Sequence, residues 1–303
     1  MTKLSVLIPT YNCRCYTLAE TLQKQLAATG EDYEILVADD GSRDQVSLIA
    51  NLKINELDNC RFIRREKNVG RAAIRNFLAD EAKGEWILFI DNDASVPSNG
   101  YIATYLETFK NNDIDAVVGG LYHPETCPSP HVTLRYRYEK KADLHRSAKE
   151  RSEHPFMHFT TFNFAIRRKF FKQIRFDETC REYGYEDTLL GVELYKLNIR
   201  LIHIDNPLIH LGLDKNDFYL KKVETSLHTL LSLGDKIQDY SHVANTAKQL
   251  SNYHAARLYE AFFHVTKGIM RKNLTGAKPN LTVFSMYKLG LYIQLSHSGH
   301  IKK

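Results

Sequence analysis

Short apolar runs alternate with helix-like periodicity along the first ninety residues. The runs predict strands at residues 4–8, 34–38, 61–63 and 86–90. Between them, apolar residues recur every three or four positions, which predicts helices at residues 17–28, 44–52 and 69–82. Strands that alternate with helices are typical of βαβ units. The chain is therefore predicted to have an α/β fold, with a mostly parallel, twisted sheet flanked by helices.

Turn and capping residues set the expected ends of these elements. Pro9 stops the first strand, and Gly30 is expected to end the first helix. Asn68 is expected to cap the helix over residues 69–82, because an asparagine side chain can accept a hydrogen bond from the free N–H groups of a first helical turn.

The second half of the chain shows a different pattern. Phe162, Phe164 and Ile166 recur at every second position, which predicts an edge strand with one buried face. A helix is predicted over residues 188–197, and a strand-like run follows at residues 201–204.

Two further segments stand apart in composition. Residues 123–155 include Pro124, Pro128 and Pro130 and a basic run, which suits a mobile lid or an acceptor loop. Residues 215–303 are predicted to be helical, and one helix carries an apolar stripe made of Leu258, Phe262, Val265 and Ile269. Basic residues flank this apolar stripe, so the helix either lies on a membrane surface or packs on the rest of the protein.

Composition indicates a globular protein with a large core. The chain has 303 residues, of which 43% are hydrophobic. Its five cysteines are scattered and lack zinc-finger spacing, so they are expected to be reduced thiols. The N-terminus runs straight into a strand and shows no signal-peptide pattern, and no run of about 18 apolar residues occurs. These features predict a cytoplasmic protein.

The net charge of +5 is distributed unevenly. Residues 1–214 hold 28 Lys and Arg against 31 Asp and Glu, a net charge of −3, whereas residues 215–303 hold 13 against 5, a net charge of +8. Such asymmetry indicates that the C-terminal part meets an anionic surface. No nucleic-acid-binding motif is found, so an anionic membrane at the inner face of the plasma membrane is the expected peripheral contact. A solvated basic helical face would give the same count.

The stretch Asp91-Asn92-Asp93 follows directly after a predicted buried strand. Ligands of open α/β sheets gather at the carboxyl ends of strands, and paired carboxylates suit Mg²⁺ or Mn²⁺ better than Zn²⁺. A metal ion there would hold a diphosphate. The alternative interpretation is an ordinary acidic loop.

Three strand ends converge at this edge of the predicted sheet, after residues 8, 38 and 90. The glycine-rich patterns of dinucleotide-binding folds and P-loops are missing from the sequence. A phosphate held by metal at Asp91 and Asp93 is then the remaining way to bind a nucleotide at this edge.

An ordered set of segments resembles family 2 glycosyltransferases. They are SVLIPTYN at residues 5–12, VADDGS at 37–42, NVGRAA followed by Arg75-Asn76 at 68–76, and GEW leading into DND at 84–93. The resemblance covers about residues 4–214. It implies a GT-A fold with a nucleotide-sugar-binding half at residues 1–120 and an acceptor half at 121–214, followed by a helical C-terminal extension at 215–303.

The resemblance implies an inverting transfer of a sugar from a nucleotide-diphosphate sugar, with UDP-sugars as the expected donors. The acceptor would be a glycan or a lipid-linked molecule in the biosynthesis of a bacterial cell-surface polysaccharide, and a divalent metal, Mn²⁺ or Mg²⁺, would be needed. The sequence also allows a catalytically silent nucleotide- or glycan-binding module on the same fold, or a sugar-1-phosphate nucleotidyltransferase. The N-terminal signature of the nucleotidyltransferases is missing.

The resemblance also implies which residues contact the nucleotide-sugar. These are Pro9, Thr10, Tyr11, Asn12, Asp39, Asp40, Arg71, Arg75, Asp91 and Asn92. A carboxylate at Asp40 suits the imide N–H of uracil, whereas Asp39 is expected to hold the turn and cap the next helix. Arg71 and Arg75 lie four residues apart on one helical face, and either one reaches the donor or both form salt bridges with the acidic loops.

The remaining implied roles concern the metal, the acceptor and the chemistry. Asp93 would ligate the metal, and His210 would complete the metal site or else be a core histidine; His203 is expected to be structural. Asn163 would touch the donor sugar or the acceptor, or face water from its strand. Glu186 and Asp187 end the stretch EYGYED at residues 182–187.

A pair of carboxylates at a helix start is favoured by the helix dipole alone. The resemblance makes Asp187 the catalytic base, with Glu186 as the alternative or as a neighbour that orients the site. An inverting transfer needs such a carboxylate to take the proton of the attacking hydroxyl.

Overall fold

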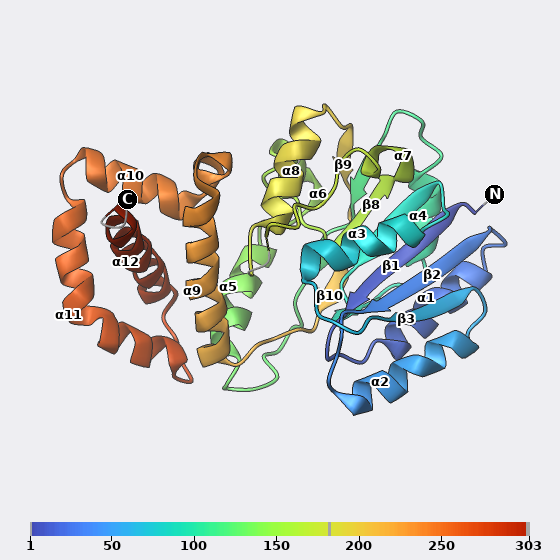
Figure 1. Ribbon diagram of the computed structural model, residues 1–303, viewed down its shortest axis with the longest axis horizontal. Coiled ribbons are helices and arrows are strands. Elements are labelled where there is room, and N and C mark those ends of the chain that lie inside the picture. Colours follow the sequence, from blue (N-terminus) through green and yellow to red (C-terminus); the bar gives the residue numbers. More distant parts are fainter. Residues whose placement is uncertain (1, 181–182, 301–303) are drawn as a thin grey trace. The chain divides into compact units, whose positions relative to one another are not determined.

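The structure, a computed structural model, describes residues 2–180 and 183–300 (Figure 1). It forms two compact units. The first comprises Met1–Pro124, Asp143–Arg181 and Glu186–Gly212, and the second comprises Glu125–Ala142, Glu182–Tyr185 and Leu213–Lys303. Residues 125–142, which the sequence places in the acceptor half, therefore group with the C-terminal helices. Glu182, in the predicted acidic stretch, lies outside the described residues.

A seven-stranded sheet is the centre of the first unit. Its strands are β1 (Leu4–Thr10), β2 (Tyr33–Asp39), β3 (Cys60–Arg64), β4 (Trp86–Ile90), β6 (Ala116–Val118), β8 (Asn163–Arg167) and β9 (Leu201–His203). They lie in the order β3-β2-β1-β4-β8-β6-β9. All neighbouring pairs are parallel except those that involve β8. The predicted mostly parallel α/β sheet is confirmed, including the four strands of the first ninety residues.

The prediction that β8 is an edge strand is wrong. β8 lies between β4 and β6 and pairs antiparallel with both. Its residues 163–166 are all buried, because helices cover both faces of the sheet. The alternation of large and small side chains along β8 reflects the two packed faces, not one wet and one dry face.

Helices of the first unit cover the two faces of the sheet (Figure 1). One face packs against α1 (Tyr16–Ala27), α2 (Gln45–Leu52) and α4 (Tyr101–Thr108). The other packs against α3 (Arg71–Glu81), α7 (Arg168–Phe171) and α8 (Glu186–Lys196). Alternate residues of β1 divide between the two cores: Val6 and Ile8 face α1, and Leu7 faces α3.

The start of α3 differs from the prediction. The residue before the helix is Gly70, with φ 93°, and no side chain caps the helix. Asn68 was expected to fill that role, but the backbone N–H groups of Val69 and Gly70 are taken by the carboxylate of Asp40, from the end of β2. A tertiary contact thus replaces the local cap.

A small three-stranded sheet extends the same unit. It consists of β5 (Ala94–Ser95), β7 (Leu121–Tyr122) and β10 (Leu208–His210), with β10 in the middle. β10 pairs antiparallel with β5, in the register His210↔Ala94, and parallel with β7. This pairing places the end of β10 beside the loop that follows β4.

The second unit is helical. It holds most of α5 (Thr133–Asp143) together with α9 (Asn216–Leu233), the 3-10 turns η2 (Gly234–Lys236) and η3 (Gln238–Tyr240), α10 (His242–Asn252), α11 (Ala256–Thr275) and α12 (Leu281–His300). Figure 1 shows α12 enclosed by α9, α10 and α11, and all three contact it. Phe284, Tyr287 and Leu291 of α12 are buried, so the predicted C-terminal helices are confirmed.

The prediction of a lid or loop over residues 123–155 is wrong for much of its length. Residues 133–143 form α5, and residues 148–153 form α6 (Ala148–Glu153), in the first unit. α6 begins with a capping box, in which the Ser147 side chain accepts from the backbone N–H of Glu150 and the Glu150 side chain accepts from the backbone N–H of Ser147. Leu134 anchors α5 as a fully buried residue.

Among the described residues, none of the helices has both the length and the apolar character needed to cross a membrane.

Candidate active site

The loops after β1, β2 and β4 meet at one edge of the sheet, as the sequence predicts. β1 pairs in register with β2, Thr10 opposite Asp39, and it also pairs with β4. Asn92 Nδ2, in the loop after β4, donates to Thr10 Oγ1 at 3.0 Å. Pro9 is half-buried, whereas Tyr11 is 46% exposed, so the Tyr11 ring is accessible to a ligand at this edge.

Asn12 and Asp39 hold the turn after β2. Asn12, at φ 49°, accepts with Oδ1 from two backbone N–H groups of this turn, including that of Asp44 at 3.1 Å. Asp39 Oδ2 accepts from the Ser42 N–H at 2.9 Å, and Oδ1 accepts from the Ser42 hydroxyl. The expectation that Asp39 is a turn residue is confirmed. The cap of α2, however, is Asp44 rather than Asp39.

Asp40 is buried and joins β2 to the start of α3. Its two carboxylate oxygens accept from the N–H groups of Val69 at 2.9 Å and Gly70 at 3.0 Å. Burial raises the pKa of the Asp40 carboxyl, although these two hydrogen bonds oppose the shift. Because a carboxylate has about four lone-pair sites, both oxygens keep accepting capacity for a further donor.

Arg71 and Arg75 both form salt bridges with acidic residues in this structure. Arg75 is buried, and its Nη2 lies 2.5 Å from Asp91 Oδ1. Arg71 is about half exposed, and its Nη1 lies 3.4 Å from Glu186 Oε1. Of the two alternatives that the sequence leaves open, the salt bridges are the one observed. The pairs connect α3 to the loop after β4 and to the start of α8.

One buried arginine thus stands among three carboxylates. Burial by itself lowers the pKa of the Arg75 guanidinium, but Asp91, Asp187 and Glu186 raise it overall. The guanidinium is therefore a fixed positive charge at the centre of the site. It connects the acidic loop after β4 with the two carboxylates that the sequence singles out at residues 186 and 187.

Asp187 is held by two threonines that lie just before β8. Its Oδ1 accepts from Thr161 Oγ1 at 2.6 Å, and its Oδ2 accepts from the Thr161 N–H and from Thr160 Oγ1, both at 3.2 Å. Burial raises the pKa of the Asp187 carboxyl, and the negative charge of Glu186 raises it further, while Arg75 and Thr161 oppose the shift. Asp187 is thus a more basic carboxylate than an ordinary exposed aspartate.

Asp93 and His210 face one another across the small sheet. His210 Nε2 lies 3.3 Å from Asp93 Oδ2, and the Leu211 N–H donates to the Asp93 carbonyl at 2.9 Å. His210 is buried, as a core histidine would be, and it also faces Asp93, as a metal ligand would.

The residues around Asp93 fit a divalent metal. A carboxylate oxygen and an imidazole nitrogen are a donor set that Mn²⁺ accepts. Gly212 leaves the space: a Cβ at this position would lie 1.8 Å from Asp93 Oδ2 and 3.1 Å from His210 Nε2. Any side chain at residue 212 would therefore displace both of these groups.

Asn163 does not face a ligand. It is fully buried, and its Oδ1 accepts from the hydroxyls of Tyr101 and Tyr105, each at 2.7 Å. Its Nδ2 donates to the carbonyls of Gly120 and Asn206, each at 2.9 Å. These four hydrogen bonds make Asn163 a structural residue, contrary to the expectations that it touches a sugar or faces water.

His203 is a structural residue, as predicted. Its Nδ1 lies 2.6 Å from Arg151 Nη1, and its Nε2 lies 2.9 Å from the Pro155 carbonyl. Burial lowers its pKa to about 4, so the ring is neutral near pH 7.

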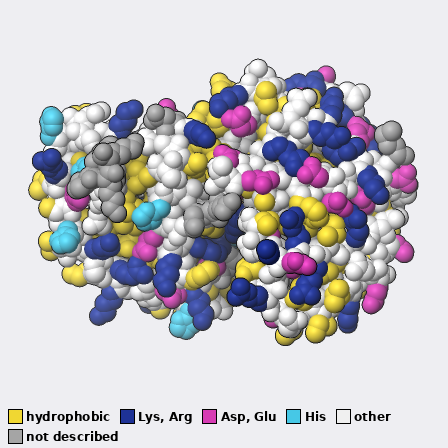
Figure 2. Space-filling model, in the orientation of Figure 1, with side chains coloured by type: hydrophobic (Ala, Val, Ile, Leu, Met, Phe, Trp, Pro, Cys, Tyr) yellow, Lys and Arg dark blue, Asp and Glu magenta, His cyan; other side chains and the backbone are white. Residues whose placement is uncertain are grey.

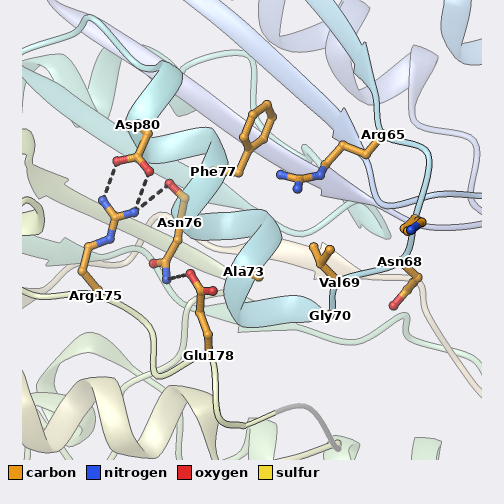
Figure 3. Close-up of a pocket in the computed structure, with 11 residues that line it drawn as sticks. Arg65, Asn68, Val69, Gly70, Ala73, Asn76, Phe77, Asp80, Arg175 and Glu178 are labelled. Atoms are coloured by element: carbon orange, nitrogen blue, oxygen red, sulfur yellow. Dashed lines mark hydrogen bonds and ion pairs between the residues drawn. The ribbon is translucent and has the colours of Figure 1, made fainter.

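A cavity of about 680 Å³ runs along the outer side of α3 (Figure 3). Arg175 forms a two-pronged ion pair with Asp80, at 2.6 and 2.7 Å, and Asn76 donates to Glu178 at 2.8 Å. These contacts fasten residues 175–178, which precede α8, to α3. The cavity also borders residues 68–70, the loop that Asp40 holds, so it lies beside the candidate site rather than over Asp187.

Sequence reasoning missed several residues of this site. His123 and Asp143 lie in the segment interpreted as a lid, and Gly212 follows the last predicted strand. Thr161 directly precedes the predicted strand that contains Phe162, and no pattern in the sequence singles it out. A histidine directly after a short apolar run, as at Leu121-Tyr122-His123, was the available signal for His123, and the distance of Asp143 along the chain hides its role.

Comparisons with known structures define the class of the protein. A mannosyltransferase from Pyrobaculum calidifontis, PcManGT, solved in complex with GDP-Man and Mn²⁺, matches 99% of this chain with 87% of its own, at 15% identity and a TM-score of 0.58. S. aureus TarS 1–349 in complex with UDP-GlcNAc matches 98% with 92% of its own, at 16% identity and a TM-score of 0.52. Together with the mixed sheet, these likenesses define a GT-A-type fold with a C-terminal helical part.

The family follows from the sequence itself. The family model described as Glycosyl transferase family 2 matches residues 5–175, more than half of the chain, so this chain belongs to glycosyl transferase family 2. Chondroitin synthase of Escherichia coli is 30% identical over 230 residues, which cover 64% of this chain and 32% of the synthase. The chain spans about a third of the length of the curated relatives that it matches.

Proposed function

We propose that this protein is an inverting, metal-dependent glycosyltransferase that moves a sugar from a nucleotide-diphosphate sugar to a hydroxyl group. The observation that carries the proposal is the cluster in which Arg75 pairs with Asp91, from the donor side, and interacts by charge with Glu186 and Asp187. The division into a donor half at residues 1–120, an acceptor half at 121–214 and a helical extension at 215–303 belongs to the same proposal.

Asp187 is the proposed base. In an inverting transfer, a carboxylate takes the proton of the acceptor hydroxyl as that oxygen attacks the anomeric carbon from the face opposite the leaving diphosphate. Asp187 meets this need because its oxygens are fixed by Thr160 and Thr161 and its pKa is raised by burial. A raised pKa makes the ionised carboxylate a better proton acceptor, and general bases contribute about 10²–10⁴-fold in rate.

Asp93 and His210 are the proposed metal ligands. A divalent ion bound there, Mn²⁺ or Mg²⁺, would hold the donor diphosphate and offset the negative charge of the leaving group. Asn92 would stay hydrogen-bonded to Thr10, so that the loop after β4 and the loop after β1 present one surface to the nucleotide.

The proposed donor is a UDP-sugar, and the proposed acceptor is a glycan or a lipid-linked molecule of a bacterial cell-surface polysaccharide. Asp40 supports the first point, because its carboxylate can still accept from the imide N–H of uracil. The accessible ring of Tyr11 would stack on the base. The similarity to chondroitin synthase supports a polysaccharide product.

A panel of UDP- and GDP-sugars, scored for release of the nucleoside diphosphate with Mn²⁺, with Mg²⁺ and with chelator, tests the function. One donor should be consumed, and only with metal. Asp93→Ala should abolish metal-dependent donor binding, whereas Asp187→Asn should keep donor affinity and lower kcat by about 10²–10⁴-fold.

Other outcomes of this experiment would overturn the proposal. Donor binding without turnover under every condition, for any acceptor, indicates a silent binding module. Formation of pyrophosphate from a nucleoside triphosphate and a sugar phosphate indicates a nucleotidyltransferase. An active Asp187→Asn variant beside a dead Glu186→Gln variant would move the role of base to Glu186.

We also propose that the apolar stripe docks on an anionic membrane from the cytoplasmic side. Among the described residues of the second unit, the side chains of the stripe are exposed: Leu258, Phe262, Val265 and Ile269 are 77, 43, 79 and 75% exposed. The buried face of α11 is formed instead by Phe263, Met270 and Leu274. The structure thus leaves this face of α11 on the surface of its unit.

The basic side chains beside the apolar stripe favour an anionic membrane as its binding partner. Arg257, His264 and Lys272 are exposed on α11, and none of the exposed side chains of this described helix is acidic. Figure 2 shows dark blue Lys and Arg side chains over the part of the molecule that holds α9 to α12, as well as over the first unit. A second copy of the chain would bring like charges together, whereas anionic lipids attract basic side chains by about 1 kcal/mol each.

Co-sedimentation with vesicles of anionic and of neutral lipid tests this docking surface. The protein should sediment with anionic vesicles, and the double variant Val265→Asp, Ile269→Asp should stay in the supernatant. Ile49→Asp, at a 63% exposed position of α2, is the control for an added charge. Equal sedimentation of the double variant, or a dimer that the double variant dissolves, would overturn the membrane proposal.

A further inference from the structure

We infer that His123 and Asp143 are positioning residues that set which nitrogen of His210 is available to a metal ion. This inference rests on the proposed metal site at Asp93 and His210. His123 follows β7, and His210 ends β10, the strand that pairs with β7. His123 Nε2 lies 3.2 Å from His210 Nδ1.

Asp143 determines the tautomer of His123. Its Oδ1 lies 2.9 Å from His123 Nδ1, and its Oδ2 accepts from the backbone N–H of His123 at 3.0 Å. Arg146 Nη1 lies 3.3 Å from Asp143 Oδ1, so this carboxyl group also has a cationic partner. A carboxylate only accepts hydrogen bonds, so the proton of a neutral His123 ring is on Nδ1 and its Nε2 is an acceptor.

The tautomer of His210 follows from that of His123. Because His123 Nε2 accepts, His210 Nδ1 must donate, so the proton of a neutral His210 ring is on Nδ1. Its Nε2 then carries a lone pair, and this atom lies 3.3 Å from Asp93 Oδ2. His210 Nε2 and Asp93 Oδ2 are then both acceptors, and they repel one another. A cation bound between the two atoms would remove this repulsion.

Packing keeps this arrangement in place. The side chain of His123 is fully buried and that of Asp143 nearly so. The ring of Phe162 packs at an angle of 67° on the ring of His210, with centroids 4.9 Å apart, which fixes the His210 ring from another side. Partners behind a metal-bound histidine orient the ring, and their removal typically lowers metal affinity by about 10–100-fold.

Mn²⁺ binding to the full chain, followed by electron paramagnetic resonance of the free ion, tests this inference without reference to turnover. His123→Leu should weaken Mn²⁺ binding by about 10–100-fold. His123→Gln, whose amide oxygen can accept from His210 Nδ1, should recover part of the loss. Asp143→Asn should also weaken binding, because an amide can donate to His123 Nδ1 and no longer requires a proton there.

The matched control is His145→Leu, since the His145 side chain is 80% exposed and pairs only loosely with Glu150, at 3.3 Å. This variant should bind Mn²⁺ as the unmodified chain does. A direct readout is available as well: in the metal-free protein, ¹⁵N shifts of the histidine rings should show His210 protonated on Nδ1, and the signal should be lost in His210→Gln.

The outcomes separate this inference from the proposed metal site. If Asp93→Ala and His210→Ala abolish Mn²⁺ binding but a folded His123→Leu does not weaken it, the site stands and the role of His123 is refuted. If Asp93→Ala binds Mn²⁺ normally, the metal site itself is refuted. Protonation of His210 on Nε2 alone, as the ring shifts would report, would also overturn the inference, whatever the fate of the variants.

Discussion

At the scale of residues, the candidate site depends on how a few carboxylates are surrounded. Asp187 and Glu186 are neighbours in the sequence, yet their side chains have different surroundings in the structure. Glu186 pairs with the half-exposed Arg71, whereas Asp187 accepts hydrogen bonds from Thr160 and Thr161. The two carboxylates therefore have different partners. Burial and the negative charge of Glu186 raise the pKa of Asp187.

This difference predicts opposite effects of two substitutions on the pH dependence of kcat. The base must be ionised, so the rate should rise with pH as Asp187 loses its proton. Glu186→Gln removes the neighbouring negative charge, which lowers the pKa of Asp187 and should move the rising limb to lower pH. Thr161→Val removes a hydrogen bond that favours the ionised form, so the limb should move to higher pH.

Profiles of kcat against pH for the two variants, with the donor saturating, are the measurement. Asp187→Asn serves as the reference, because its residual rate should not show this limb. Shifts of both variants in the same direction would mean that another group controls the limb, and loss of all activity in Glu186→Gln would point to Glu186 as the base.

At the scale of elements, close contacts between helices and loops decide where substitutions are tolerated. In the second unit, α11 crosses α12 at Gly290, where an added Cβ would lie 2.3 Å from the ring of Phe263. In the same pair of helices, Gly268 of α11 is exposed, and a Cβ there would meet no atom within 4 Å. The two glycines have the same helical context and opposite surroundings.

Gly290→Ala should therefore destabilise the protein, and Gly268→Ala should stabilise it. The first change overpacks the α11–α12 contact, which typically costs about 1–3 kcal/mol. The second removes a flexible residue from a helix interior, which typically gains about 0.5–1 kcal/mol. Urea unfolding followed by the helical circular dichroism signal measures both changes, and equal effects of the two substitutions would contradict the close contact between Gly290 and Phe263.

At the scale of the whole molecule, the candidate active site and the excess of basic residues lie in different units. The candidate site, with Asp93, His210 and Asp187, lies entirely in the first unit. The basic excess of residues 215–303 and the apolar stripe lie in the second. The two activities proposed for the chain should therefore respond separately to the solution conditions.

Salt should separate these two activities. Exposed charges are screened over about 10 Å at 0.1 M salt, so binding to anionic vesicles should weaken steeply as NaCl rises from low to high concentration. Consumption of the nucleotide-sugar with a water-soluble acceptor should change much less, because Arg75 and its carboxylate partners are buried or half-buried. Vesicle binding that does not depend on salt would show that charge does not drive it.

The sequence by itself determined the elements and the edge at which the chemistry gathers. Short apolar runs such as residues 86–90 predicted strands that are buried on both faces of a sheet, because every side chain of such a strand meets a core. All five residues of this strand are buried. The loops that follow them meet at one edge, because parallel strands all end on the same side. The family segments, matched over residues 5–175, therefore identified the fold and most of the candidate residues.

Only the tertiary structure decided the roles of particular side chains. Asn163 and Asp93 are both polar residues next to buried strands, yet the first is enclosed by two tyrosines and the second faces His210. The positions of His123 and Asp143 behind His210, and the space at Gly212, depend on contacts between distant parts of the chain. A linear pattern records which residues are apolar, but hydrogen bonds and close approaches are set by which strands and helices pack together.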